Sequence, residues 1–234
     1  MEWLALSPEE WVAVSLSLKV SIWATIVSLP VGIVVAHILA RREFVGKSVL
    51  NGLVHLPLIL PPVVTGYLLL LSFGRRGPVG SLLESCCGLV FSFRWTGAAL
   101  ACGVMAFPLM VRAIRLSLEA TDRRLEQAAS TLGAGPWRVF FTVTLPLAWP
   151  GLVAGSVLAF AKALGEFGAT ITFVSNIPGE TQTLSSAIYG LMQVPGGEAG
   201  IWRLAAVAGA ISLAALLFSE WLVRRHYSRQ DEDV

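Results

Sequence analysis

The chain has 234 residues, of which 55% are hydrophobic and only 14% are charged. Because a soluble domain averages about 25% charged residues, we expect much of the surface of this protein to face a lipid bilayer. The formal net charge of +2 does not indicate nucleic acid or an acidic substrate as a partner. The three cysteines (Cys86, Cys87 and Cys102) lack the spacing of a disulfide framework or a metal site, so no metal ion is expected.

Residues 1–10 are acidic and lack the basic region of a signal peptide, so the apolar run that follows is expected to remain in the mature protein. A helix needs about 20 mostly apolar residues to cross the hydrocarbon core of a bilayer. Five segments meet this condition: Trp11–Leu39, Val49–Phe73, Trp95–Val111 (with an extension to Leu116 left open), Leu147 to beyond Leu164, and Ile201–Val223. The apolar stretches 86–93 and 167–174 are too short to cross alone.

The distribution of Lys and Arg orients these spans, because cytoplasmic loops carry an excess of both residues. One set of loops contains Arg41, Arg42, Lys47, Arg112, Arg115, Arg123, Arg124, Arg138, Arg224, Arg225 and Arg229. The opposite set contains only Arg75, Arg76, Arg94 and Arg203, which are expected to be solvated or to contact a soluble partner. This bias predicts an outer N-terminus (1–10), a transmembrane domain (11–223) and a cytoplasmic tail (224–234).

The loop after the first span contains the sequence "GKS" (residues 46–48), which is similar to the end of a phosphate-binding P-loop. A P-loop requires a glycine five residues before Gly46, and this position is Arg41. A P-loop also joins a strand to a helix, whereas this loop joins two expected spans. We therefore expect that the chain binds neither ATP nor another cofactor.

Prolines interrupt the second expected span at Pro57, Pro61 and Pro62. Each proline removes a backbone hydrogen bond and clashes with the preceding turn of a helix. A broken helix at membrane depth is tolerated where protein or a water-filled cavity covers it. Two interpretations stay open: a kinked helix that packs against its neighbours, or a break that lines a pathway, in which Thr65 offers its hydroxyl to a solute.

Between the third and fourth spans lies the stretch "LEQAASTLGAGPWRVFFTVTLP" (residues 125–146), which the charge bias places in the cytoplasm. The first part of this stretch, together with the residues before it, predicts a helix that has Asp122 as its N-cap and Gly133 just past its end. The residues of one face of this helix are apolar or small: Leu125, Ala128, Ala129 and Leu132. The other face carries Glu126, Gln127, Ser130 and Thr131.

Pro136 is expected to begin a second short helix, which carries Trp137, Phe140 and Phe141 and stops before Pro146. Small residues allow the close approach of another protein, so we favour a docking role for the two helices. A helix lying on the bilayer surface and packing within the chain remain the alternatives.

Ionisable residues inside a membrane span are functional candidates by default. Lys162 and Glu166 are four residues apart and therefore share one face of the fourth span. They form either a structural pair or part of a pathway or gate, and Thr170 is a further gate candidate in the short apolar stretch that follows. The small residues Gly151 and Gly155 are expected to pack against another span, and Lys19 is expected to extend towards the outer interface.

The segment from Gln127 to Pro146 resembles the EAA loop of ABC importer permeases, which reads E-A-A, three residues, G, nine residues and I-x-L-P. Ala128, Ala129 and Gly133 match the pattern, whereas Gln127 replaces the glutamate and Val143 replaces the isoleucine. Glu126 is a candidate stand-in for the missing acid. In this family the loop enters a groove on the ATP-binding subunit and transmits its motion. The resemblance implies that coupling involves Leu125, Glu126, Gln127, Ala128, Ala129, Leu132, Gly133 and Pro136.

Three other stretches, residues 56–80, 107–119 and 165–181, look like the molybdate branch of this family. The resemblance implies an all-α integral membrane protein with about five transmembrane helices and the type I ABC importer permease fold, in the bacterial inner membrane. It also implies a homodimer, two copies of an ATP-binding subunit that holds ATP and Mg²⁺, and a periplasmic molybdate-binding protein.

Tungstate and sulfate remain alternative cargoes, and a passive channel or a membrane-embedded enzyme remains an alternative of another class. A channel would not need the docking loop. An enzyme is disfavoured because His37, His55 and His226 lie near the ends of spans and do not cluster.

Overall fold

The computed structural model describes residues 6–232, with side chains described up to residue 225. Within this range the secondary structure is helical and contains no strands. The helices are α1 (Pro8–Arg41), α2 (Lys47–Ile59), α3 (Pro62–Phe73), α4 (Pro78–Cys87), α5 (Trp95–Ala120), α6 (Arg123–Thr131), α7 (Pro136–Val139), the π-helix η2 (Phe140–Thr144), α8 (Leu145–Leu147), α9 (Trp149–Leu164), α10 (Gly168–Val174), α11 (Leu184–Leu191) and α12 (Glu198–Glu232). The side chains of His226 and Arg229 lie outside the described part.

Three of these helices, α1, α5 and α12, are long and apolar enough to cross a membrane. Two further spans are added if each of two bent pairs counts as one: α2 with α3, bent by 114°, and residues 136–147 with α9, bent by 69°. The expected number of about five spans is reached only in this way. The third span is longer than expected, since α5 continues to Ala120.

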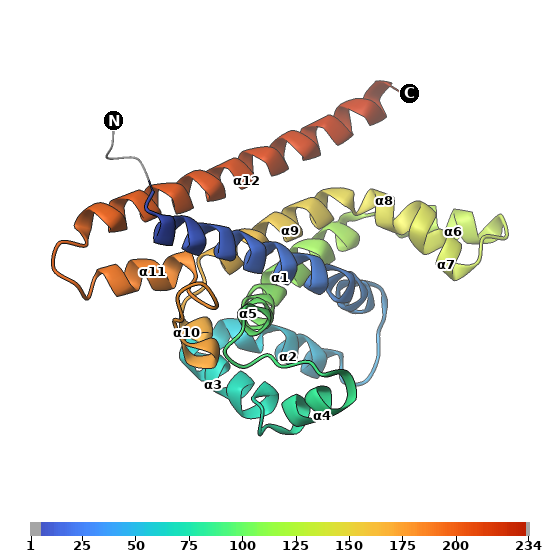
Figure 1. The fold of residues 1–234 in the computed structure, drawn as a ribbon. Helices are drawn as coiled ribbons and strands as arrows, with labels where there is room; N and C mark the ends of the chain where they lie inside the picture. The colour runs from blue at the N-terminus through green and yellow to red at the C-terminus, as the bar shows by residue number, and fades with distance from the viewer. Residues whose placement is uncertain (1–5, 233–234) are drawn as a thin grey trace.

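Helix α5 lies at the centre of the bundle and packs mainly against α1 and α9 (Figure 1). Small residues permit this close packing. A side chain at Gly151 would place its Cβ 2.2 Å from Cβ of Ser117, which is too close for the two helices to stay where they are. Gly155 similarly faces the backbone oxygen of Met110 on α5. The packing interpretation of Gly151 and Gly155 is therefore confirmed, and the neighbour of this face is α5 of the same chain.

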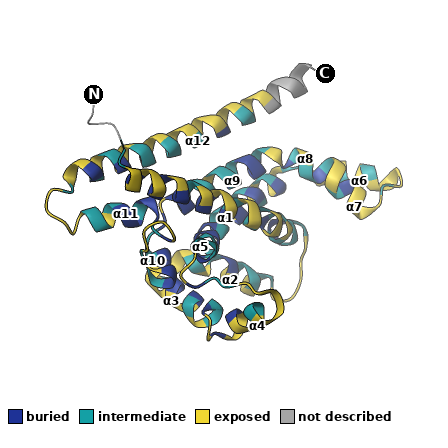
Figure 2. Cartoon of the chain, in the orientation of Figure 1, coloured by how far each residue is buried: buried dark blue, intermediate teal, exposed yellow. Residues whose placement is uncertain are grey.

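Helix α12 begins against α11 and α9, and its C-terminal part then extends away from the other helices (Figure 1). Figure 2 shows mainly exposed and intermediate residues along it. Its exposed apolar side chains include Leu213, Leu216, Leu217, Phe218 and Trp221. Such a surface is suited to lipid or to another membrane helix, in agreement with the low charge content of the chain.

An ion pair joins the first and last long helices where both begin. Arg203 donates from Nη2 and Nε to the two carboxylate oxygens of Glu10, at 2.7 and 3.1 Å. Ser7 completes the arrangement as a capping box with Glu10 at the start of α1. Arg203 is thus held by an ion pair within the chain, while its contact with a soluble partner remains a prediction.

Lys19 lies with its Nζ 3.8 Å from the centre of the Trp95 ring, so a cation–π contact holds it at the start of α5. One further expectation about local structure is wrong. The helix after Gly135 does not stop before Pro146 but continues as η2 and α8 to Leu147, with the bend at Ala148. Pro146 directly follows the π-helix η2, and the chain remains helical through it to Leu147.

Candidate functional site

The residues of the expected docking stretch form a helix, a turn and a second helix that extend away from one end of the bundle (Figure 1). Asp122 caps α6, since its side chain accepts a hydrogen bond from the Arg124 N–H at 2.9 Å. Gly133 has a φ of +85°, a conformation that glycine adopts without cost. Pro136 begins α7. These local predictions are confirmed.

The apolar surface of this segment is uncovered in the single chain. Leu125 is 50% exposed, Leu132 is 87% exposed and Trp137 is 76% exposed. Trp137 also stacks on Phe141, with 6.4 Å between the ring centres. Large exposed apolar side chains that gather on one surface indicate a contact with another protein or with a membrane. Packing within the chain therefore leaves Leu132 and most of Trp137 uncovered.

The polar face of α6 points towards the bundle. Glu126 accepts a hydrogen bond from Arg41 Nη2 at 2.9 Å and another from the Thr144 hydroxyl at 3.0 Å. The Arg41 side chain is only 7% exposed. Glu126 thus joins α1, α6 and η2, and it is bound inside the chain rather than presented to a partner. Gln127, by contrast, is exposed, and the role of Glu126 as a stand-in for the acid of the EAA pattern remains a prediction.

Further contacts fasten the segment to the end of α1. Arg41 Nη2 also lies 3.4 Å from the Thr121 carbonyl oxygen, and Arg123 donates to the Ala40 carbonyl oxygen at 3.0 Å. Phe140 of η2 packs edge-on against His37 of α1, with 5.0 Å between the ring centres. A displacement of the segment would therefore act on α1 as well as on α5 and α9.

In the adjacent loop between α1 and α2, Glu43 forms an ion pair with Lys47 at 2.6 Å. The hydrogen bond from Lys47 holds the pKa of the Glu43 carboxyl below its usual range. Glu43 therefore remains charged and bound to a neighbour four residues away, and it takes no part in the contacts between α1 and α6.

The candidate gate residues of the fourth span lie where that span breaks. Glu166 is 2% exposed and lies between α9 and α10. Its carboxylate accepts hydrogen bonds from Lys162 Nζ and, at 3.1 Å, from the Ala169 N–H in the first turn of α10. Thr170 donates to the Phe167 carbonyl oxygen at 2.8 Å. The pairing of Lys162 with Glu166 is therefore confirmed, while a gate role for these residues remains a prediction.

Pro61 and Pro62 lie at the break of the second span, whereas the expected interruption at Pro57 is wrong, because Pro57 lies inside α2. The chain leaves helical geometry at Leu60, and α3 begins at Pro62 after the bend. Pro61 and Pro62 are exposed, whereas Thr65 is 5% exposed, and its hydroxyl has no hydrogen-bond partner among the described residues.

The two broken spans meet because α3 packs against α10. A Cβ at Gly66 would lie 2.5 Å from the Ala169 carbonyl oxygen, and one at Gly168 would lie 2.7 Å from Cβ of Pro62. The structure thus brings the candidates of the second span next to those of the fourth. It does not bring them to the docking segment, which α9 separates from them by 16 residues, or about 24 Å.

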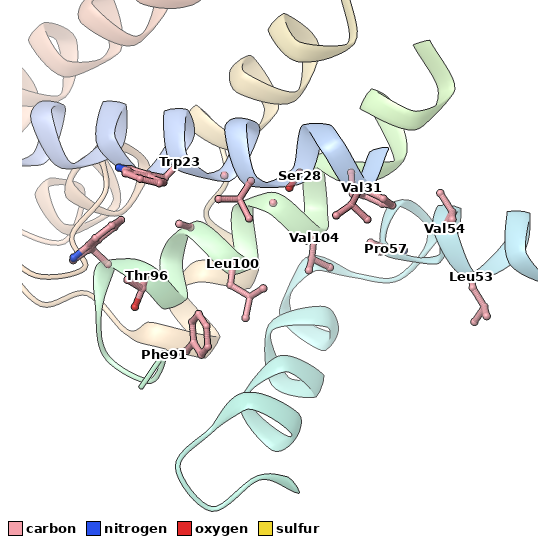
Figure 3. A pocket seen from close by; sticks show the side chains of 16 residues that line it. Trp23, Ser28, Val31, Leu53, Val54, Pro57, Phe91, Thr96, Leu100 and Val104 are labelled. Atoms are coloured by element: carbon pink, nitrogen blue, oxygen red, sulfur yellow. The ribbon is translucent and has the colours of Figure 1, made fainter. Parts of the chain in front are cut away.

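A cavity of about 740 Å³ lies between α1, α2 and α5. Figure 3 shows its labelled walls, with Trp23 and Val31 on α1, Leu100 and Val104 on α5, and Pro57 on α2. Almost all of these side chains are apolar. Burying an ion beside such walls is costly because they offer no charge and few hydrogen bonds. The cavity is therefore unsuited to an inorganic anion.

The sequence places the chain among known transport proteins. Residues 28–230 match the family model described as "Binding-protein-dependent transport system inner membrane component". The chain belongs to this family. It is therefore a multi-pass membrane protein of a binding-protein-dependent ABC transporter, and the family members that it matches are permease components rather than enzymes.

Relatives in this family include two molybdenum permeases and a sulfate permease. The chain is 61% identical to the molybdenum transport system permease protein ModB of Escherichia coli (strain K12), over 94% of this chain and 96% of the relative. It is 59% identical to ModB of Haemophilus influenzae, over 91% and 93%. It is 40% identical to the sulfate transport system permease protein CysW of Synechococcus elongatus, over 72% and 60%.

Solved structures of permeases share the fold. A bacterial ABC transporter involved in the import of alginate superposes with a TM-score of 0.70 at 18% identity, covering 94% of this chain and 80% of that chain. The MetNI methionine ABC transporter superposes with a TM-score of 0.65 at 14% identity, covering 93% and 94%. The chain accordingly has the type I ABC importer permease fold.

Sequence patterns alone did not identify Arg41 and Thr144 as the partners of Glu126. Arg41 contributed only to the charge bias, and Thr144 occupies a variable position of the EAA pattern. A buried arginine that pairs with a carboxylate 85 residues away leaves no local signal. Only the packing of α1 beside α6 reveals it.

Proposed function

We propose that the chain is the permease of an ATP-driven importer that carries molybdate across the bacterial cytoplasmic membrane. The observation that carries this proposal is the 61% identity, over nearly the full length, to a molybdenum transport system permease. The three stretches that look like the molybdate branch support the same cargo. The N-terminus is proposed to lie in the periplasm and the C-terminus in the cytoplasm, as the distribution of Lys and Arg indicates.

The exposed apolar surface of α6 and α7 is the proposed binding site for the ATP-binding subunit. Leu125, Leu132 and Trp137 would fill a groove on that subunit, while Ala128 and Ala129 would permit close approach. ATP and Mg²⁺ would be bound by the partner, and ATP hydrolysis would occur there. Two copies of the chain would form the transport pathway between them, each with one ATP-binding subunit below and a shared molybdate-binding protein above.

The proposed mechanism is alternating access driven by movement of the docking segment. Helix α9 follows this segment after a single bend at Ala148 and ends at Leu164, beside the break that contains Glu166. A rigid helix transmits a displacement at one end to the other end. Movement of α6–α8 would therefore act on α10 and, through the close contact at Gly66, on α3. Pro61, Pro62, Thr65, Lys162, Glu166 and Thr170 remain the proposed pathway or gate residues.

The experiment that tests the cargo is uptake of radiolabelled molybdate into cells that lack their own permease gene, with tungstate and sulfate as competitors. Molybdate and sulfate are both tetrahedral dianions, and the 40% identity to a sulfate permease makes sulfate the main alternative. We expect uptake that an excess of unlabelled molybdate or tungstate suppresses and that sulfate leaves largely unchanged. Preferential competition by sulfate would overturn the molybdate proposal while leaving the importer mechanism in place.

A further inference from the structure

A second hollow, of about 560 Å³, lies between the cytoplasmic end of α1 and the polar face of α6. Its walls are lined by His37, Arg41, Arg42, Arg123, Glu126, Gln127, Ser130, Thr131, Pro136, Val139, Phe140 and Thr144. The apolar docking residues Leu125, Ala128 and Leu132 are not among them. The hollow and the docking surface therefore occupy opposite faces of one short helix.

The charges of the hollow favour an anion. Three guanidinium groups, those of Arg41, Arg42 and Arg123, face one carboxylate, that of Glu126, which gives an excess of two positive charges. Glu126 is already bound to Arg41 Nη2 and to Thr144. The nearby carboxylate of Glu43 does not offset the excess, because it forms an ion pair with Lys47. Guanidinium groups also match the geometry of tetrahedral oxyanions with paired N–H donors.

Two buried nitrogen atoms of the lining have no hydrogen-bond partner among the described residues. They are Nε of Arg41 and Nδ1 of His37. The Arg41 side chain is more than nine-tenths buried, so its Nε–H has lost its contact with water without gaining an acceptor. The hydroxyl groups of Ser130 and Thr131 differ, because both donate to carbonyl oxygens of α6 itself. Arg41 Nε–H is thus a donor that lacks an acceptor, and His37 Nδ1 is a second atom of the lining whose hydrogen-bonding capacity is unused.

We propose that this hollow binds a tetrahedral oxyanion between α1 and α6, held mainly by Arg41, Arg42 and Arg123. Two kinds of ligand carry such a group: a free inorganic anion of the cytoplasm, and an anionic lipid at the membrane surface, through its phosphate. The site rests on the geometry and charge of the hollow. Only the choice of tungstate as a probe rests on the proposed function.

The test uses the purified full-length chain in lipid nanodiscs and the variant R42Q/R123Q, which removes two of the three arginines but leaves the Arg41–Glu126 pair. The matched control is R124Q/R138Q, which removes the same charge from exposed arginines outside the hollow. Binding of tungstate and of inorganic phosphate is measured by titration calorimetry in neutral phosphatidylcholine discs. Retained phosphatidylglycerol is measured by native mass spectrometry of the detergent-purified proteins.

We expect the native chain and R124Q/R138Q to behave alike and R42Q/R123Q to bind about a hundredfold more weakly or not at all, since each of its two lost charged hydrogen bonds weakens binding about tenfold. Tungstate or phosphate binding with this pattern identifies a free anion. Phosphatidylglycerol retained by the native chain and the control but lost from R42Q/R123Q identifies a lipid headgroup.

The proposal is overturned if the native chain binds neither probe nor lipid, or if both variants lose binding equally. Molybdate uptake by the same variants, measured separately in cells, keeps the two proposals distinct. A native chain that binds tungstate in this hollow but transports no molybdate would refute the proposed cargo and leave the oxyanion site intact.

Discussion

The docking segment (α6–α8) and the meeting point of α3 with α10 are both short helices next to breaks, but the first extends away from the bundle, whereas the second lies where two spans pack together (Figure 1). The docking segment exposes Leu132 and Trp137 and turns Glu126 towards the bundle. At the meeting point, Thr65, Glu166 and Thr170 are buried, while Pro61 and Pro62 are exposed. An exposed apolar surface gains free energy when a partner covers it. Buried polar groups instead need internal partners, which Glu166 and Thr170 find within α9 and α10.

The comparison implies that substitutions at the docking segment change binding, whereas substitutions at the meeting point change stability. The largest effect is expected for Leu132→Asp. Leu132 is 87% exposed, so the fold should be unaffected, while a charge at the centre of a contact costs about 2 kcal/mol or more. This corresponds to at least about thirtyfold weaker binding of the ATP-binding subunit.

Co-purification of that subunit with the tagged chain measures the effect of Leu132→Asp, and molybdate uptake should fall in parallel. Arg124→Asp is the control, because Arg124 is exposed on the same helix but belongs neither to the apolar face nor to the hollow. Unchanged co-purification in Leu132→Asp would remove α6 from the proposed interface.

Glu166→Ala should be the most destabilising change at the meeting point. It removes the acceptor for the Ala169 N–H and for Lys162, and losing a hydrogen bond to a charged group costs about 1.5–3 kcal/mol. Thermal unfolding in detergent measures the effect. Glu166→Gln, which keeps one side-chain oxygen, should lose clearly less stability than Glu166→Ala. If Glu166→Ala unfolds at the same temperature as the native chain and yet alters uptake, Glu166 acts as a gate rather than as a cap for α10.

Gly66→Ala tests the contact between α3 and α10. The added Cβ would lie 2.5 Å from the Ala169 carbonyl oxygen, so the helices must separate, at a cost of about 1–3 kcal/mol. Gly52→Ala on α2 is the matched control, since a Cβ there meets nothing within 4 Å. The control should be neutral or slightly stabilising, because alanine favours a helix. Equal melting temperatures for both variants would contradict the close packing.

The smallest effect is expected for the Arg41–Glu126 pair, which connects the polar face of α6 to α1. A double-mutant cycle of Arg41→Gln and Glu126→Gln should give a coupling energy of about 1 kcal/mol in thermal unfolding. The two groups are 2.9 Å apart and mostly buried, so water screens them weakly. If the two single substitutions were additive, α1 would not be energetically linked to the docking segment through this contact.

Much of the local structure could be predicted from the sequence. Asp122, Gly133 and Pro136 set the ends of α6 and α7 because capping depends on neighbours within a few residues. The same reasoning failed at Pro146, since the pattern does not show whether a proline stops a helix or lies within a helix that continues. The number of spans was predicted, but the size of the bends was not, because 114° depends on what α3 packs against.

The sequence by itself determined the membrane class, the segments that span or nearly span the bilayer, the docking helices and the family. The class, the spans and the short helices follow from composition, period and local capping, which are properties of contiguous residues, whereas the family rests on the resemblance of four stretches to known permeases. Only the tertiary structure decided that Glu126 forms an ion pair with Arg41 and that three arginines line one hollow. It also decided that Arg203 pairs with Glu10, which lies 193 residues away in the sequence. Charged side chains find partners by proximity in space, and hydrophobic packing of the long helices fixes that proximity.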